Sequence, residues 1–395
     1  MSDIFSATDS LKGYIYQIRY ALLIALQEDI NEIAIEKFDD VSIEDINDNM
    51  KMYQLKHHKE GNLTDSSPDL WKTIRIWSKK INDGDVDISE SEIRYFIITT
   101  QNAKEGSIAY RLTRRGTKDL ENTHIEDIVK TLDDISNKSK NKENESSYVE
   151  YNKLSMEDKK SLVQRIEVID NEPTINEIDK KIIRELRYSC SRSQTESFFN
   201  RLESWWYKQT IEHLLTPNLE PIKKDLILDK IDDLREQFSA DNLPIDFAED
   251  INIDTKYYQE YNFVKQIKII RTTRSSRIVN AINDFYKAYH QRATWGKENL
   301  VSVEELYRYE RMLCSEWERA VDAIMDEKTE YEDAARCGRR IYNWMEIDAK
   351  IHLREKCTEP YVMRGSYHML ANDLKVGWHP DFELLLREIE EGELA

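Results

Sequence analysis

The chain has few glycines and prolines for its length of 395 residues. Its 10 glycines and 7 prolines argue against an all-β architecture and against a glycine-rich phosphate loop. Neither G-x-x-x-x-G-K-[ST] nor G-x-G-x-x-G occurs in the sequence, so we do not expect nucleotide binding through those loops. If ATP takes part in the function, a partner must therefore bind it.

Cysteines and long apolar runs are also scarce. The four cysteines are widely spaced and form no C-x-x-C pair, which argues against a disulfide framework or a zinc site and suits a reducing compartment. The first ten residues have no basic cluster of the kind that begins a signal peptide. The longest apolar run, Ala21 to Leu26, is far too short to cross a bilayer. We expect a soluble, cytoplasmic protein.

Positive charge is in deficit, with 57 Lys and Arg against 76 Asp and Glu and a net charge of −19. Affinity for nucleic acid comes largely from neutralised phosphates, so an acidic chain of this kind repels DNA. Any DNA affinity must then come from local basic patches or from assembly of several copies.

Hydrophobic periodicity predicts an α/β arrangement in the first part of the chain. The expected order is helix, three strands, helix, strand, which is the core order of a restriction-endonuclease-like α/β fold. We expect Asp9 or Ser10 to cap the first helix. The expected elements are a helix over 11–28, strands over 32–36, 40–44 and 51–57, a helix over 67–82 and a buried strand over 94–100.

The second part of the chain reads as mainly α-helical. The polar segment 137–147 is expected to be a surface loop. The prolines at 217 and 221 interrupt helical propagation and predict a domain boundary at 215/216. Helices are expected over 222–238, 264–289, 303–326 and 331–355.

The candidate catalytic residues are Asp40, Gln54 and Lys56. Residues two apart on a strand point to the same face, so Gln54 and Lys56 share a face while Tyr53 and Leu55 can be buried on the other. A carboxylate and an amide oxygen can hold a hard divalent cation, and a lysine can help to position the attacking water. The pattern indicates a metal-dependent phosphodiesterase, although a surface β-meander with scattered charges would have the same residues.

Several further ligands are possible. Asp39 and Asp40 are adjacent and point to opposite faces of a regular strand, so Asp39 replaces Asp40 as the ligand only if the strand begins with a bulge. Glu36 and Gln17 are secondary metal-ligand candidates, or else surface hydrogen-bonding groups. Because Gln54 lacks a carboxylate's charge, we expect low metal affinity before DNA binds.

The candidate DNA-binding residues are all basic. We expect them to contact the phosphate backbone, the alternative being a solvated face; they are His58, Lys59, Lys72, Arg111, Arg114, Arg115 and Lys118. A second series recurs every third residue from Lys265 to Arg277. On an α-helix that spacing would spiral around the axis, which favours partner binding or salt bridges over DNA reading.

Two parts of the sequence resemble known families. GYIYQIRYALLIAL (13–26), IEKFDDV (35–41), YQLKHHKEGNLTDSSPDLWKTIRIW (53–77) and FIITTQNAKEGSIAYRL (96–112) are similar to the PD-(D/E)XK-type nuclease domain of bacterial anti-phage effectors, including those associated with CD-NTases. LESWWYK (202–208), INDFYKAYHQRATW (282–295), YERMLCSEWERAV (309–321) and GWHPDFE (377–383) are similar to the effector subunit of ABC three-component, or Lamassu-type, defence systems.

The resemblance implies a nuclease domain over 1–215 and a helical oligomerisation and partner-binding domain over 216–395. It implies a Mg²⁺- or Mn²⁺-dependent endonuclease acting on double-stranded DNA. It further implies an SMC-like ATPase and a small accessory subunit as partners, from which the effector is released to form an active oligomer, expected to be a homotetramer. The family's commoner motif has an acid where this chain has Gln54, so a nuclease-like scaffold without turnover is the alternative.

Overall fold

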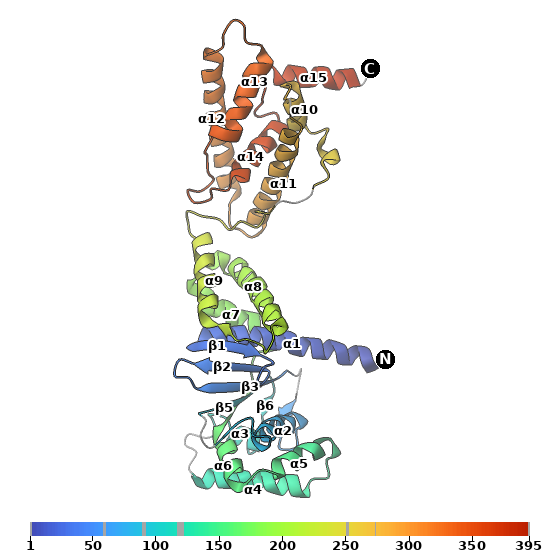
Figure 1. Ribbon diagram of the computed structural model, residues 1–395, viewed down its shortest axis with the longest axis vertical. Coiled ribbons are helices and arrows are strands. Elements are labelled where there is room, and N and C mark those ends of the chain that lie inside the picture. Colours follow the sequence, from blue (N-terminus) through green and yellow to red (C-terminus); the bar gives the residue numbers. More distant parts are fainter. Residues whose placement is uncertain are drawn as a thin grey trace. The chain divides into compact units, whose positions relative to one another are not determined.

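The structure is a computed structural model that describes residues 2–57, 61–88, 92–116, 122–249, 253–272 and 274–393. The chain divides into two compact units, one of residues 1–189 and 199–232, and one of residues 190–198 and 233–395 (Figure 1). In the described parts, no helix combines the length and the apolar character that crossing a membrane requires.

The first unit is built on a six-stranded mixed sheet. The order is β7-β5-β3-β2-β1-β8, in which β1, β2 and β3 pair antiparallel and β3, β5 and β7 pair parallel. The strands are β1 (Ile30–Ile35), β2 (Val41–Asp45), β3 (Met50–Lys56), β5 (Arg94–Thr99), β7 (Ile166–Ile169) and β8 (Ile222–Lys223), while β4 (Asn62–Leu63) and β6 (Asn102–Ala103) form a separate pair. The expected order of helix, three strands, helix, strand is confirmed.

Helices connect these strands. Between β3 and β5 runs α2 (Pro68–Asn82), which begins after Ser67 with proline in its first turn, as expected. The other helices of this part are α1 (Ser2–Gln27), α3 (Ile108–Arg111), α4 (Asn122–Lys138), α5 (Glu145–Asn152), α6 (Met156–Arg165), α7 (Ile178–Glu185), α8 (Thr195–Leu215) and α9 (Lys224–Gln237).

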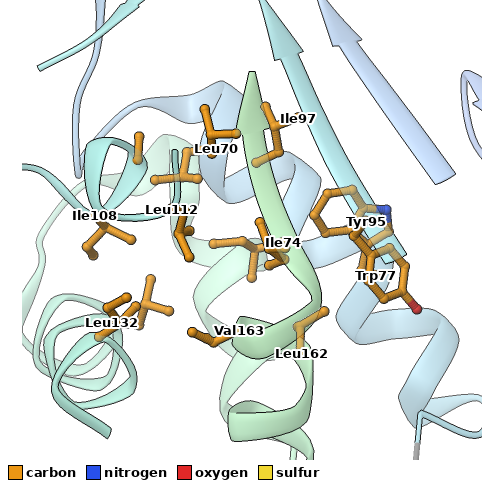
Figure 2. Close-up of a cluster of buried hydrophobic side chains, with 14 of the residues drawn as sticks. Leu70, Ile74, Trp77, Tyr95, Ile97, Ile108, Leu112, Leu132, Leu162 and Val163 are labelled. Atoms are coloured by element: carbon orange, nitrogen blue, oxygen red, sulfur yellow. The ribbon is translucent and has the colours of Figure 1, made fainter. Parts of the chain in front are cut away.

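Helices cover both faces of β3, and its side chains point alternately towards one layer of helices and the other. On one face, Met52 joins Tyr95 and Ile97 of β5 in a buried cluster with side chains of α2 to α6 (Figure 2). On the other face, Tyr53 stacks on Phe96 with ring centroids 4.8 Å apart and donates a hydrogen bond to a Glu28 carboxylate oxygen after α1. A polar side chain in the middle of β3, such as that of Gln54, is therefore buried.

Two local expectations are wrong. The first helix begins at Ser2, so neither Asp9 nor Ser10 caps it. The segment 137–147 is no surface loop: it contains the end of α4, a 3₁₀ turn and the start of α5. Asn144 is fully buried and donates a side-chain hydrogen bond to the Ser66 carbonyl at 3.1 Å. Most residues of the segment are exposed, as its polar composition predicted, but its backbone is largely helical and a contact distant in sequence buries Asn144.

The first unit continues beyond the expected boundary at 215/216. Strand β8 follows the two prolines and pairs antiparallel with β1, with Ile222 opposite Ile33. The helix expected over 222–238 is α9, and its stripe of Ile227, Ile231, Leu234 and Phe238 is buried as expected. The prolines thus mark a turn that returns the chain to the sheet, and the division between the units falls at 232/233.

The second unit is helical, and its buried core combines aliphatic and aromatic side chains. Its helices are α10 (Asn262–Ile269), α11 (Ser276–Lys297), α12 (Val303–Asp326), α13 (Ala334–Asn343), α14 (Pro360–Asn372) and α15 (Phe382–Glu393). Trp378 is fully buried, as expected. The prediction of one continuous helix over 264–289 is wrong, because α10 ends before Arg271, which has φ +55°. The basic series from Lys265 to Arg277 therefore does not spiral along one helix.

A second helix of this unit is shorter than expected. In place of a helix over 331–355, α13 ends at Asn343 and a π-helical turn, Trp344–Asp348, follows it. The helix expected over 303–326 is confirmed as α12.

Candidate active site

The candidate site lies where β1, β2 and β3 meet at one end of the sheet. Glu36 follows β1 with φ +57°, and its backbone N–H donates to the Asp40 carbonyl at 3.1 Å. Val41, the first residue of β2, pairs with Tyr53 of β3. The Leu55 backbone N–H also donates to the Asp40 carboxylate at 2.8 Å. Asp40 is thus fixed to the strand that carries the other two predicted catalytic residues.

Gln54 is buried without a partner for its side-chain oxygen. Its residue exposure is 3%, and its Oε1 accepts no hydrogen bond. An unpaired buried amide oxygen costs on the order of 1–3 kcal/mol. Lys56, two residues further along β3, ends the strand and shares its face with Gln54. Gln54 therefore presents an oxygen that a ligand could use.

Glu36 and Gln17 join the same group of side chains. Burial raises the pKa of Glu36, and the charges of Asp40 and Asp39 raise it further, while a hydrogen bond with Gln17 and the Lys56 charge act in the opposite direction. The Oε1 of Gln17 is buried without a hydrogen-bond partner, like that of Gln54. The structure thus places Glu36 close to Asp40 and Lys56, and Gln17 within hydrogen-bonding reach of Glu36.

Asp39 turns away from this group. Its carboxylate accepts a hydrogen bond from the Trp77 indole N–H at 2.6 Å and another from the Asp40 backbone N–H at 3.0 Å. Burial raises the pKa of Asp39 to about 6, even though the Trp77 hydrogen bond lowers it. Nothing in the local sequence shows what the Trp77 N–H contacts. Here the indole holds the residue that precedes Asp40.

The basic residues predicted to bind DNA are paired with acids wherever the structure describes them. Lys72 lies 3.3 Å from Glu143, Arg111 lies 2.8 Å from Asp127, Arg115 lies 2.5 Å from Asp170, and Arg114 forms an ion pair with Glu167. His58, Lys59 and Lys118 lie outside the described residues. A phosphate at any of the four described positions would compete with a carboxylate, and DNA contact by these residues stays a prediction.

Within the described residues, no three His, Cys, Asp or Glu side chains converge on a metal position. The candidate site offers a different set of donors: two carboxylates, on Glu36 and Asp40, and the two unpartnered amide oxygens of Gln17 and Gln54. All four groups are oxygen donors, which Mg²⁺ and Mn²⁺ prefer. The residues present therefore fit a hard divalent cation.

Comparison with protein families gives two matches. Residues 8–193 match the family described as Cap4, dsDNA endonuclease domain. Residues 263–386 match the family described as C-terminal domain 7 of the ABC-three component systems. The first match includes every residue of the candidate site, and the second lies within the helical unit. A search of the curated proteins found no match.

Solved structures of Cap4 receptors also share weak similarity with this chain. A Cap4 SAVED/CARF-domain containing receptor of Moraxella osloensis is 15% identical with a TM-score of 0.35, and the match covers 66% of this chain and 58% of the receptor. The Acinetobacter baumannii receptor with the cyclic trinucleotide 2'3'3'-cAAA is 14% identical with a TM-score of 0.31, and the match covers 66% of this chain and 57% of the receptor. This chain thus spans somewhat more than half of the length of these receptors.

Proposed function

Because this chain joins a Cap4-type nuclease domain to a C-terminal domain of the ABC-three component systems, we propose that it is a metal-dependent DNA endonuclease and the effector of a bacterial anti-phage complex. The proposed nuclease fold is of the PD-(D/E)XK type. Its sheet has an antiparallel β1-β2-β3 meander followed by parallel β5, which supports this assignment.

One observation carries the proposal. Gln54 places a buried, unpartnered oxygen next to Leu55, whose backbone N–H binds the Asp40 carboxylate, and Lys56 shares the Gln54 face of β3. A fold stabilised for its own sake would pair or remove a buried amide oxygen, since leaving it unpaired is unfavourable. Retaining it next to the backbone N–H that binds the Asp40 carboxylate is consistent with a ligand site that is completed only when a cation is bound.

Each residue of the site has a role that follows from its chemistry. Asp40 and Gln54 would hold the cation, with Glu36 and Gln17 in reach of it; a bound Mg²⁺ or Mn²⁺ supplies Lewis-acid stabilisation of the charge on the scissile phosphate. The Leu55 N–H keeps the Asp40 carboxylate in place. The Lys56 ammonium orients the attacking water and offsets negative charge that develops in the transition state.

The proposed regulation follows the Lamassu-type resemblance. We expect an SMC-like ATPase and a small accessory subunit to hold the effector inactive, and release to allow a homotetramer to form. An acidic chain of net charge −19 binds DNA weakly alone. Several nuclease domains in one assembly would raise the effective affinity without new contacts. Light scattering and DNA cleavage on the same full-length sample test this point: an active monomer would contradict it.

A second candidate function is a nuclease-like scaffold that binds DNA or protein without turnover. The presence of Gln54 where the commoner motif has an acid favours it, as does the lack of three convergent acidic, His or Cys ligands among the described residues. DNA binding is compatible with both functions, and only the first predicts strand cleavage.

The test is plasmid cleavage by the full-length protein with Mg²⁺ or Mn²⁺ against EDTA. Asp40→Ala should abolish cleavage, because it removes the carboxylate from the metal position. Circular dichroism should show an unchanged fold. Equal cleavage by Asp40→Ala and the parent would refute the site, and metal-independent cleavage would refute the proposed chemistry.

A further inference from the structure

The helical unit contains a pocket of 360 Å³ whose wall is mostly aromatic. It lies between the segment that precedes α10, one face of α11 and the end of α14. The six ring-bearing residues of its lining are Tyr258, Tyr261, Phe285, Tyr286, Tyr289 and His290. Met369, Asn372 and Asp373 complete the lining. We call this the aromatic pocket.

The rings of the aromatic pocket contact one another and form a continuous wall. Tyr258 and Tyr261 have ring centroids 5.2 Å apart, and both meet Phe285, at 6.0 and 5.6 Å. Along α11, His290 packs on Tyr286 at 4.2 Å and on Tyr289 at 5.4 Å. The wall is nevertheless open to solvent, since Tyr289 is 52% and Tyr261 38% exposed. An occupant would remove these aromatic surfaces from water, which is favourable.

The charge of the lining selects among occupants. Asp373 is its carboxylate, and no lysine or arginine is among the residues that line it. A nucleotide or phosphopeptide would bring phosphate to a wall with no cation, which disfavours both. An aromatic face attracts a cation through its quadrupole, and a carboxylate at the rim adds to that attraction. Asp373 is only loosely paired with Lys375, at 3.8 Å.

Two other aromatic rings of the helical unit contact cationic side chains of the same chain. Arg277 lies over the Tyr342 ring at 5.1 Å, and Lys287 lies over the Tyr361 ring at 5.7 Å. Those two rings are not in the lining of the aromatic pocket. A planar guanidinium both stacks on rings and carries charge, so it matches the wall and the carboxylate together.

We propose that the aromatic pocket binds an arginine side chain presented by a partner protein. Arginine would stack against the tyrosine rings of α11 and the preceding segment, with its charge facing Asp373. This pocket takes no part in DNA cleavage. It gives the helical unit a surface for a partner protein of the ABC-three component systems.

The experiment uses the full-length protein and two small probes. Ligand-observed NMR would compare N-acetyl-arginine methylamide with N-acetyl-citrulline methylamide, which has nearly the same shape and no charge. We expect the arginine probe to bind with roughly tenfold higher affinity than the citrulline probe, in keeping with a cation–π contribution of about 1.4 kcal/mol. Equal affinity would overturn the proposal in favour of an uncharged occupant.

Variants localise the binding. Tyr289→Ala and Asp373→Asn should each lower the affinity for the arginine probe about three- to tenfold, because each removes a group that lines the pocket. Both side chains are exposed, so neither change should disturb the core. Tyr257→Ala is the matched control, since Tyr257 is 80% exposed, precedes a lining residue and is not itself in the lining. An unchanged affinity in Tyr289→Ala and Asp373→Asn, or no binding of the arginine probe up to about 50 mM, would overturn the proposal. Binding of a second copy of this chain would appear as a concentration-dependent mass that Tyr289→Ala abolishes, and would overturn the assignment to a different protein.

Discussion

Polar residues lie towards both ends of strand β3, but those towards its start have hydrogen-bonding partners, whereas the Gln54 oxygen towards its end has none. At its start, Lys51 lies 2.6 Å from a Glu28 oxygen, and the Tyr53 hydroxyl donates to the other oxygen of the same carboxylate at 2.7 Å. At its end, the Gln54 oxygen has no partner although it is buried. Paired polar groups join α1 to the sheet at one end, whereas unpaired oxygen donors collect at the other. The difference separates a structural role from a ligand-binding role on a single strand.

The carboxylates beside the two ends differ in the same way. Asp45, at the end of β2 near the start of β3, accepts hydrogen bonds from the backbone N–H groups of Asn47 and Asn49 at 2.9 and 3.1 Å. Desolvation would raise the pKa of Asp45, but these hydrogen bonds outweigh it and lower the pKa. At the other end, burial raises the pKa of Asp39 to about 6. The balance between burial, which raises the pKa of a carboxylate, and hydrogen bonds to the carboxylate, which lower it, decides the sign of each shift.

The largest expected effect separates the two lysines of this strand. Lys56→Ala should lower plasmid cleavage by roughly 10²-fold or more, because it removes the only ammonium on the Gln54 face of β3. Lys51→Ala is the matched control: it should leave cleavage within about twofold and lower the free energy of unfolding by about 0.5 kcal/mol, since its ion pair is partly exposed. Equal losses of cleavage in the two variants would remove the distinction between the ends of the strand.

A smaller effect is expected when Gln54 is replaced by glutamate, which supplies the negative charge that the amide lacks. Gln54→Glu places a carboxylate beside Asp40, so the metal concentration for half-maximal cleavage should fall roughly tenfold. In EDTA the same variant should unfold at a lower temperature than the parent, because two buried carboxylates repel each other. Mg²⁺ should restore the melting temperature, which differential scanning fluorimetry would show. A melting temperature that Mg²⁺ leaves unchanged would argue against metal binding at this position.

The third prediction compares two buried tryptophans of α2. Trp77 donates to the Asp39 carboxylate, and Trp71 donates to the Asp65 carbonyl at 2.8 Å. Each Trp→Phe change should cost about 1–3 kcal/mol of stability, because it leaves a buried acceptor unpaired. Only Trp77→Phe should also lower cleavage, by several-fold, since it frees the residue that precedes Asp40. Cleavage rates and urea unfolding curves of both variants would test this. Equal cleavage by the two variants would show that the indole only fills the core.

The smallest effect concerns pH. The raised pKa of Asp39 means that the folded chain binds a proton more tightly than the unfolded chain, so this residue makes the protein less stable as pH rises from about 4 to about 6. Asp39→Asn should remove this contribution, and its melting temperature should vary less with pH across that interval. Asp45, whose folded pKa is lowered, contributes stability above its unfolded pKa that is lost as pH falls below about 4. A pH profile of Asp39→Asn that is identical to the parent's would contradict the assignment.

The order of elements as far as β5 follows from the sequence alone. Side chains alternate every two residues on a strand and recur every 3.6 residues on a helix. The spacing of apolar residues therefore predicted α2, β3 and β5 to within a residue or two. The same alternation placed Gln54 and Lys56 on one face and Tyr53 on the other. These features depend on neighbouring residues, so local stereochemistry determines them.

The other features of the fold and of the candidate site depend on contacts between residues far apart in the chain. Trp77 reaches Asp39 across 38 positions, Asn144 reaches Ser66 across 78, and Ile222 pairs with Ile33 only because the chain returns to the sheet. No local pattern encodes such contacts, since each depends on the packing of several elements at once. The sequence determined which residues carry the proposed chemistry, and the tertiary structure decided which of their polar atoms are left without a partner.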